Sequence, residues 1–355
     1  MNKNLRGILI NLSLIIISTL FALVVSEIAL RLIGLKPLYV SPERDRFWKY
    51  DPLLGWAHKP GQEGIFETPQ FRTLVRINDN GLRDRPHSYA RQNNIERILV
   101  LGDSFAWGYG VEESERFSQL LEKSLDVEAI NAGVSGYSTD QELLWYQNEG
   151  IKYDTDLVIL ELAGNDVDDN DQQLVNHIYY KPKFVLEEGR LIPTGYPVPK
   201  TSPQGRFIYS LSQNSALAFF LVQRYFDFRS FYHQMKVNSD HASSPVSGLS
   251  TEKEDFKLTI ALLDEMRNIA KSRNAKFMIV ATDRWWDSPP GETYEDFINT
   301  LQTEGFLVLD VESMPGFDPE VMLIPNDGHW NQAGHEFVAK EIKAFIASHQ
   351  LLSQP

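Results

Sequence analysis

Ile98-Leu99-Val100-Leu101, followed at once by Gly102-Asp103-Ser104-Phe105, is the stretch of sequence that decides the fold. Four consecutive apolar residues that end at a glycine are typical of a short strand buried on both faces. Strands of this kind belong to parallel sheets, and ligands bind such sheets beyond the carboxyl ends of the strands. Ser104 is therefore expected at a ligand-binding edge.

Four more apolar runs repeat this pattern further along the chain. They lie at residues 127–130, 157–160, 277–280 and 306–309. Stretches with helical periodicity separate the runs, and a helical pattern closes the series. Strands that alternate with helices predict an α/β fold, in which one parallel sheet is covered by helices on both faces to give three layers.

The N-terminal segment bears on the location of the protein. Residues 7–26 carry no charge and are mostly apolar, so a helix over this segment would span ~30 Å, the thickness of a bilayer core. The basic Lys3 and Arg6 precede it, which favours a cytoplasmic N-terminus and a domain outside the cytoplasm. A cleaved signal peptide is the alternative, with Val24-Val25-Ser26 as the cleavage site. We expect an uncleaved, single-pass anchor.

The remaining chain predicts one α/β domain with additions. We expect the anchor at residues 1–36, a β-rich lead-in at 37–95 and the α/β domain at 96–350. Residues 171–250 break the alternation of strands and helices and contain many aromatic residues, so we interpret them as an insertion. A lid over the site and a peripheral elaboration are both compatible with this composition.

Composition and charge exclude several classes of protein. The chain has no cysteine, which rules out disulfides, thiolate metal sites and a cysteine nucleophile. A formal net charge of −14 argues against a broad basic face for nucleic acid. The acidic run that starts at Asp166 lacks the glycine and glutamate of a calcium loop. No phosphate or dinucleotide loop is present either, so we expect neither a metal nor another cofactor.

Polar motifs follow three of the apolar runs, and a fourth lies before the last helix. Gly102-Asp103-Ser104 follows the first run, and residues 131–139, which include Gly136, follow the second. Asn165 lies behind the third run, where its side-chain amide could donate to an oxygen. His329 and neighbouring carboxylates lie in the loop before the last helix.

Together these four motifs resemble the SGNH (GDSL-type) hydrolase superfamily, whose sequence blocks carry Ser, Gly, Asn and His in this order. The resemblance covers about residues 97–345, and the apolar N-terminal segment with its lead-in resembles a membrane-anchored branch. It implies a three-layer fold with a mostly parallel, flavodoxin-like sheet. It also implies a serine esterase that works through an acyl-enzyme.

The resemblance assigns a role to each motif. Ser104 would be the nucleophile, and His329 would take its proton and later return it to the leaving group. The oxyanion would accept hydrogen bonds from the backbone N–H of Ser104 and of Gly136 and from the side chain of Asn165. His335, six residues beyond His329 in the last helix pattern, is interpreted as structural.

The acidic member of the triad departs from the common pattern. The superfamily places Asp three residues before His, where this chain has Asn326, whereas Asp327 lies two residues before His329. Residues two apart in an extended segment point to the same side, so Asp327 could reach the imidazole. We expect Asp327 to orient His329, with Asn326 as the alternative.

The substrate is less defined than the chemistry. Trp285 and Trp286 follow the fourth run and could form a wall for a sugar ring, although buried packing is the commoner role of such residues. We expect hydrolysis of an acyl ester, with acetyl among the candidates, on a glycan or lipid; the acidic chain favours a neutral substrate. The alternatives are an O-acyltransferase acting on cell-envelope or exported polysaccharide, and a noncatalytic glycan-binding component.

Overall fold

The computed structural model describes residues 3–38, 44–91, 95–175, 179–225, 228, 254–283 and 293–353. Two compact units can be distinguished, and each is described by itself. The first contains the N-terminal helix and the helical residues 203–225. The second contains the sheet and the helices that cover it. The domain boundaries expected at residues 36 and 95 stay a prediction.

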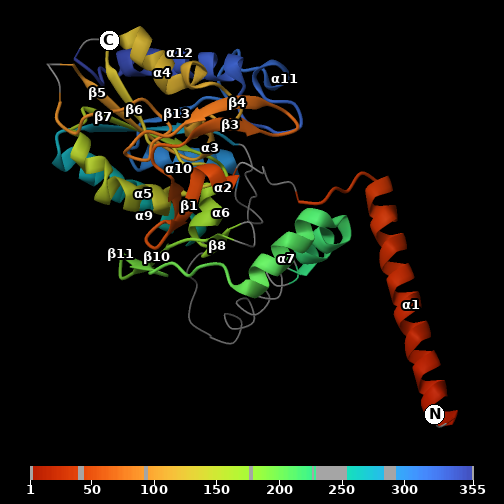
Figure 1. Cartoon of the computed structure of the whole chain (residues 1–355). Coiled ribbons are helices and arrows are strands. Elements are labelled where there is room, and N and C mark those ends of the chain that lie inside the picture. Colours follow the sequence, from red (N-terminus) through yellow and green to blue (C-terminus); the bar gives the residue numbers. More distant parts are fainter. Residues whose placement is uncertain are drawn as a thin grey trace. The chain divides into compact units, whose positions relative to one another are not determined.

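The second unit is built on a parallel sheet of five strands (Figure 1). The strands are β5 (Arg97–Leu101), β6 (Glu128–Asn131), β7 (Leu157–Leu162), β12 (Lys276–Ala281) and β13 (Val308–Asp310). Their order is β13-β12-β7-β5-β6, and every pair is parallel. This is the flavodoxin-like order, whose ligand crevice lies where the winding reverses, between β5 and β7. The predicted runs and the predicted sheet are confirmed.

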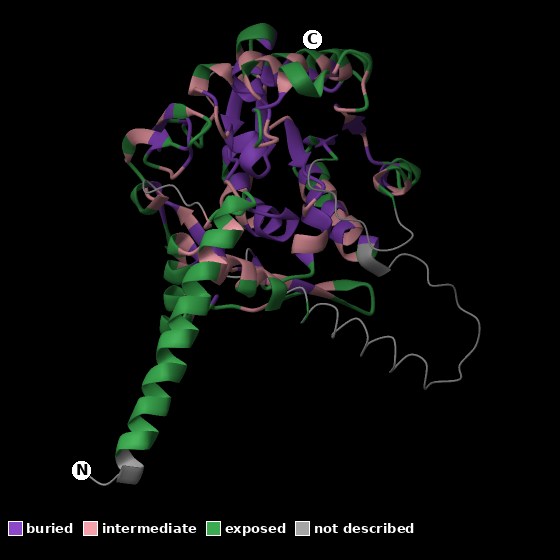
Figure 2. Cartoon of the chain, turned by 90° about the vertical axis from the view of Figure 1, so that its right-hand side faces the viewer, coloured by how far each residue is buried: buried purple, intermediate pink, exposed green. Residues whose placement is uncertain are grey.

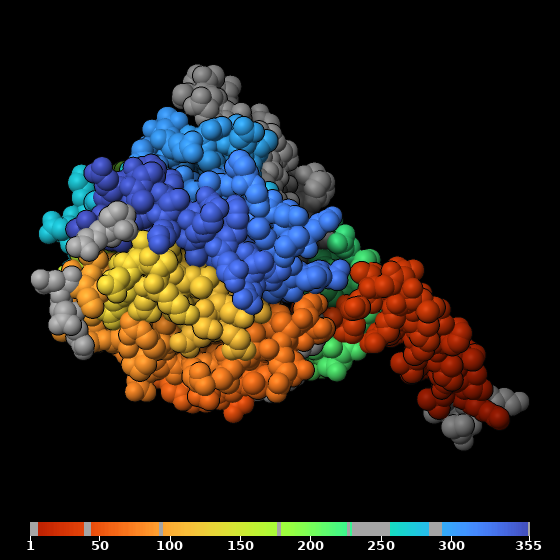
Figure 3. All heavy atoms as spheres, turned by 90° about the horizontal axis from the view of Figure 1, so that it is seen from above, coloured from red at the N-terminus to blue at the C-terminus, as the bar shows by residue number. Residues whose placement is uncertain are grey.

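Alternate residues of the strands pack on opposite faces of the sheet. In β5, Ile98 and Val100 belong to one buried cluster, and Leu99 and Leu101 belong to the other. Helices α4 and α12 complete the first cluster and lie side by side (Figure 3). Helices α5, α9 and α10 complete the second. These helices are α4 (Phe117–Leu125), α5 (Thr139–Asn148), α9 (Glu254–Ser272), α10 (Tyr294–Thr303) and α12 (Gln332–Ser348).

Two antiparallel hairpins precede the sheet in the sequence. They are β1 (Trp48–Asp51) with β2 (Gly55–His58) and β3 (Glu63–Glu67) with β4 (Arg72–Arg76), after the short helix α2 (Arg44–Phe47). Trp48 and Phe66 pack against the ring of Trp107, with centroids 5.2 and 5.6 Å away. The β-rich segment therefore buries the short helix α3 (Ser104–Trp107), in which the candidate nucleophile lies.

Smaller elements complete this unit. Two short hairpins come from the first part of the predicted insertion, and the others are single turns of helix. They are β8 (Leu174–Val175), β9 (Tyr179–Tyr180), β10 (Lys183–Glu187), β11 (Arg190–Thr194), α6 (Asp166–Asn170), α11 (Pro319–Met322) and the 3₁₀ turns Glu113–Glu115 and Gly150–Tyr153.

The first unit contains the long helix α1 (Lys3–Leu32), which is exposed along its length (Figure 2). Its stretch Arg6–Leu32 is long and apolar enough to cross a membrane, and it is the one such helix among the described residues. A signal sequence would have the same properties. Helix α7 (Pro203–Asn214) and the helical residues 216–225 belong to the same unit.

Candidate active site

The loop after β5 positions Ser104. Gly102 has a φ of +147°, and a Cβ added there would come within 2.7 Å of the Ala106 side chain, so this position requires glycine. The Asp103 side chain accepts a hydrogen bond from the Phe105 N–H (2.8 Å) and so begins helix α3. Ser104 is consequently the first residue of a short helix at the carboxyl edge of the sheet, as the sequence predicts.

Ser104, His329 and Asp327 form a continuous hydrogen-bonded chain. The Ser104 Oγ lies 2.8 Å from Nε2 of His329, and Nδ1 of His329 lies 2.5 Å from Oδ1 of Asp327. The same carboxylate oxygen accepts a hydrogen bond from the His329 backbone N–H (3.2 Å). With Nδ1–H donated to the carboxylate, Nε2 is left as an acceptor for the hydroxyl proton.

The contact with His329 stabilises the ionised form of Asp327. Burial of the Asp327 carboxyl acts to raise its pKa, but the hydrogen bonds from His329 and the electrostatic interaction with its imidazole outweigh burial and hold the pKa below its usual value of 3.8. Asp327 is therefore ionised at neutral pH. The imidazole is flanked by the rings of Tyr109 and Phe105, with centroids 4.3 and 5.0 Å away.

The contact between Asp327 and His329 arises from a turn, and the expected extended segment is wrong. Asn326 and Gly328 have positive φ values of 60° and 100°, so the chain turns back on itself around Asp327. The bond from the His329 N–H to the Asp327 side chain, two residues back, is typical of an Asx turn. The structure thus places the carboxylate of Asp327, and not the amide of Asn326, against the imidazole.

The expected oxyanion donors lie on the loops after the neighbouring strands β6 and β7. Gly136 follows β6 and has a φ of +81°, a conformation that L residues rarely adopt. Asn165 follows β7, and its Nδ2 donates to Oδ2 of Asp169 (2.9 Å), which leaves its second N–H for another acceptor. Since β5 is between β6 and β7, the three loops leave neighbouring strands at the carboxyl edge of the sheet.

Four carboxyl groups are buried behind the nucleophile. Asp103, Glu142, Glu161 and Asp166 have almost no solvent-accessible surface. Oε2 of Glu161 accepts a hydrogen bond from the Asp103 N–H (3.3 Å), and Oδ2 of Asp166 accepts one from the Ala163 N–H (3.2 Å). The side-chain bonds of Asp103 to the Phe105 N–H and of Asp166 to the Ala163 N–H shape the loops after β5 and β7.

Burial favours the neutral form of these carboxyl groups. Burial, together with the charge of Asp103, raises the pKa of Glu161 well above its usual value. Burial and the neighbouring carboxyl groups do the same for Glu142 and Asp166. Glu161 and Glu142 were not among the residues predicted from the sequence. Glu161 had a visible signal, because a lone acid inside the buried strand β7 requires a polar partner.

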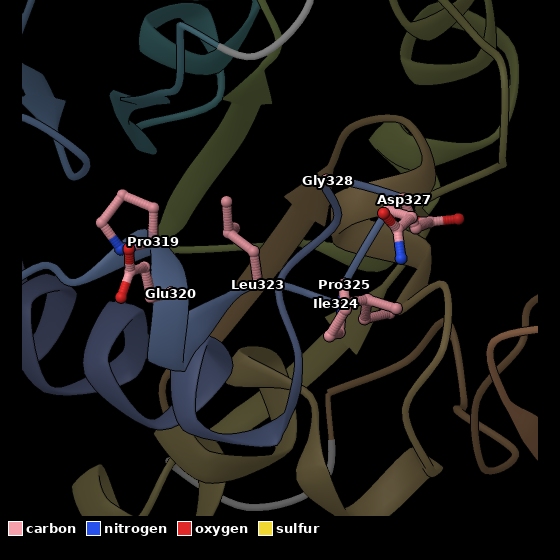
Figure 4. A pocket seen from close by; sticks show the side chains of 8 residues that line it. Pro319, Glu320, Leu323, Ile324, Pro325, Asp327 and Gly328 are labelled. Carbon is pink, nitrogen blue, oxygen red and sulfur yellow. The ribbon is translucent and has the colours of Figure 1, made fainter.

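A cavity of about 510 Å³ lies beside the acidic end of the triad. Figure 4 shows Leu323, Ile324 and Pro325 between helix α11 and the turn at Asp327. These apolar side chains form a hydrophobic wall of the cavity next to the carboxylate of Asp327. The lining residues are Pro319, Glu320, Leu323, Ile324, Pro325, Asn326, Asp327 and Gly328.

The other sequence-predicted residues have different outcomes. Trp285 and Trp286, the expected substrate wall, lie outside the described residues. His335 is fully buried in α12, where its Nδ1 accepts a hydrogen bond from the Phe117 N–H (3.3 Å). Burial lowers the pKa of His335 to about 3, so its imidazole is neutral and structural, in keeping with the sequence interpretation.

Residues 100–203 match the model of the GDSL-like lipase/acylhydrolase family. This part of the chain is therefore similar to a GDSL-like lipase/acylhydrolase domain. The match includes Ser104, Gly136 and Asn165, and it ends before Asp327 and His329. The match supports the predicted GDSL-type superfamily, whose acylhydrolases act on ester bonds.

Several solved structures resemble the fold of the GDSL-like chain. The esterase EstA from Pseudoalteromonas sp. is 15% identical over 72% of this chain and 98% of its own, with a TM-score of 0.39. A lipase/acylhydrolase from Enterococcus faecalis is 13% identical over 72% of this chain and 97% of its own, with a TM-score of 0.36. A two-domain esterase active on acetylated mannans is 13% identical over 74% of this chain and 51% of its own, with a TM-score of 0.40. Similarities this low do not indicate a substrate. No curated protein matches the chain.

Proposed function

We propose that this GDSL-like protein is a serine esterase in which Ser104, His329 and Asp327 form the catalytic triad. The observation that carries the proposal is the unbroken chain of contacts from Ser104 Oγ to His329 Nε2 (2.8 Å) and from His329 Nδ1 to Asp327 (2.5 Å). A serine hydroxyl is a weak nucleophile at neutral pH and needs a base within hydrogen-bond reach, and His329 is such a base.

The first half of the reaction forms an acyl-enzyme. Ser104 Oγ attacks the ester carbonyl carbon as His329 Nε2 takes the hydroxyl proton, and the carbonyl oxygen becomes an oxyanion. When the tetrahedral intermediate collapses, the bond to the alkoxy group breaks and His329 returns the proton to that leaving oxygen. The ionised Asp327 holds the imidazole in position and stabilises its charged form.

The second half of the reaction depends on the acceptor. With water as the nucleophile, the same proton transfers release a carboxylic acid and regenerate Ser104. With a sugar hydroxyl in place of water, the same steps transfer the acyl group. The proposal is hydrolysis, because the family is one of acylhydrolases, and acyl transfer is an outcome that the experiment below detects.

Three donors would stabilise the oxyanion. The Ser104 N–H lies in the first turn of α3 and Gly136 lies in a left-handed turn after β6. The free N–H of the Asn165 amide supplies the third donor. A single donor of this kind is worth about 2.7–4 kcal/mol of transition-state stabilisation.

The substrate is an acyl ester on a glycan or lipid, with acetyl among the candidate acyl groups. The net charge of −14 disfavours a polyanionic substrate. We further propose that α1 is retained as a membrane anchor and that the α/β unit is outside the cytoplasm, because Lys3 and Arg6 precede the apolar stretch.

The test is esterase activity of the full chain in mild detergent, with p-nitrophenyl acetate and longer esters. Wild type should release p-nitrophenol, Ser104→Ala should not, and the surface variant Ser124→Ala should match wild type. Esterase activity that survives in Ser104→Ala would refute the serine mechanism. Addition of a sugar acceptor, followed by mass spectrometry of the products, detects transfer in place of hydrolysis.

A further inference from the structure

The carboxyl-terminal end of helix α1 is bonded to a segment nearly two hundred residues away in sequence. Glu27 accepts hydrogen bonds from the Ser215 Oγ (2.8 Å) and from the backbone N–H groups of Ala216 (3.0 Å) and Leu217 (2.8 Å). These N–H groups open the helix at residues 216–225. Glu27 therefore caps that helix from outside, and its negative charge complements the helix N-terminus.

The neighbouring helix α7 is tied to the same place. Nε of Arg31 lies 2.6 Å from Oε1 of Glu27. Its Nη2 donates to the backbone oxygen of Asn214 (3.2 Å), the last residue of α7. Leu38 donates its N–H to the oxygen of Ser212 (2.9 Å). Helix α7 and residues 216–225 thus form a helix pair, called here the α1-capped pair, that is fastened to the end of α1.

The position of Glu27 sets the level of this pair relative to a bilayer. The charge-free stretch of α1 ends at Ser26, so Glu27 is the first charged residue after it. A helix that spans a bilayer with these residues has Glu27 and Arg31 at the boundary between hydrocarbon and water. The α1-capped pair, which is bonded to both side chains, is consequently held at that boundary.

The α1-capped pair exposes large apolar side chains. In α7 they are Phe207, Ile208 and Leu211, which the helical spacing places on one face, and Phe207 is 65% exposed. In residues 216–225, Leu221 and Tyr225 are also exposed and lie four residues apart, about one helical turn. The polar residues Arg206 and Ser210 lie away from the apolar side of α7. Amphipathic helices of this kind lie in the plane of a membrane interface.

We propose that the α1-capped pair is a second membrane contact, in which α7 and residues 216–225 lie on the lipid surface with their apolar side chains among the acyl chains. The occupant of this apolar face is the bilayer, because the pair is continuous with the lipid-spanning helix through Glu27 and Arg31. The inference rests on α1 being retained as the anchor, and it does not depend on the esterase chemistry.

The test places a polarity-sensitive label on single cysteines in the full chain, which has no cysteine of its own. Ile208→Cys and Leu221→Cys report on the apolar face. Ser210→Cys is the matched control, because residues two apart on a helix are about 200° apart around its axis. Each labelled protein is placed in phosphatidylcholine vesicles with or without brominated acyl chains.

The expected result is a blue-shifted emission at Ile208→Cys and Leu221→Cys that brominated lipid quenches, with neither effect at Ser210→Cys. Water-like emission at the two test positions overturns the proposal. A blue shift that brominated lipid does not quench also overturns it, since protein, from a second copy or from this chain, then covers the face.

A second variant tests the cap itself. Glu27→Leu keeps α1 apolar but removes the acceptor, so the Leu221→Cys label should lose its quenching while the protein still floats with the vesicles. Unchanged quenching contradicts the role of Glu27. Failure of the unsubstituted chain to float removes the anchor and this inference together, while esterase activity measured on the same sample reports separately on the catalytic proposal.

Discussion

Replacement of Asp327 by Ala should lower kcat by about a thousandfold. Its carboxylate lies 2.5 Å from Nδ1 of His329, and its side chain is only 15% exposed. Two unit charges about 4 Å apart near a protein surface interact with about 4 kcal/mol, and each 1.36 kcal/mol is tenfold in rate. Because His329 becomes positive only as Ser104 attacks, the loss should appear in kcat, with KM little changed.

The matched control for this prediction is Asn326→Gly. Asn326 has a φ of +60°, which glycine adopts without strain, so the turn should survive while the amide is lost. The assay is the steady-state hydrolysis of p-nitrophenyl acetate by the full chain, with thermal unfolding measured alongside to confirm folding. A larger loss of kcat in Asn326→Gly than in Asp327→Ala would refute the assignment of Asp327.

Three further predictions follow from the structure. Asn165→Ala should lower kcat by about 10²–10³-fold with a similar KM, and an unchanged kcat would remove Asn165 from the oxyanion hole. Glu161→Gln keeps the acceptor for the Asp103 N–H and should retain activity within a few fold, whereas Glu161→Ala should lower kcat. Equal kcat values for the two variants would show that Glu161 does not position this loop. Burial lowers the pKa of His58 to about 4 from 6.5. Between these two values the unfolded chain is protonated at His58 and the folded chain is not, so the free energy of unfolding should fall by about 3 kcal/mol from pH 7 to pH 4. His58→Asn, which keeps a donor for the Gly81 oxygen, should remove that part of the acid sensitivity in urea unfolding monitored by tryptophan fluorescence.

Much of the sheet could be predicted because its strands are buried on both faces. Such strands require uninterrupted apolar runs, and the runs at 98–101 and 157–160 correspond to β5 and β7. The carboxyl edge follows from the parallel arrangement, so Ser104 and Asn165 could be placed at this edge from the sequence alone.

The remaining features depend on contacts between distant parts of the sequence. Nothing local in Glu27 shows that it caps a helix that begins at residue 216, because hydrogen-bond partners so far apart leave no periodic pattern. Asp327 was expected to reach His329 along an extended segment, but the contact depends on the positive φ of Asn326 and Gly328. Asn and Gly adopt positive φ more often than other residues, but not in every context, so their presence alone does not specify this turn.

The central claim is that Ser104, activated by His329, is the nucleophile, and covalent trapping tests it most directly. The full chain is treated with a fluorophosphonate, and intact and peptide masses are then measured for wild type, Ser104→Ala and His329→Ala. One adduct per wild-type chain is expected on the peptide that contains Ser104, with none in Ser104→Ala and much slower labelling in His329→Ala. An adduct on another residue of the wild-type protein, or one that persists in Ser104→Ala, would contradict it.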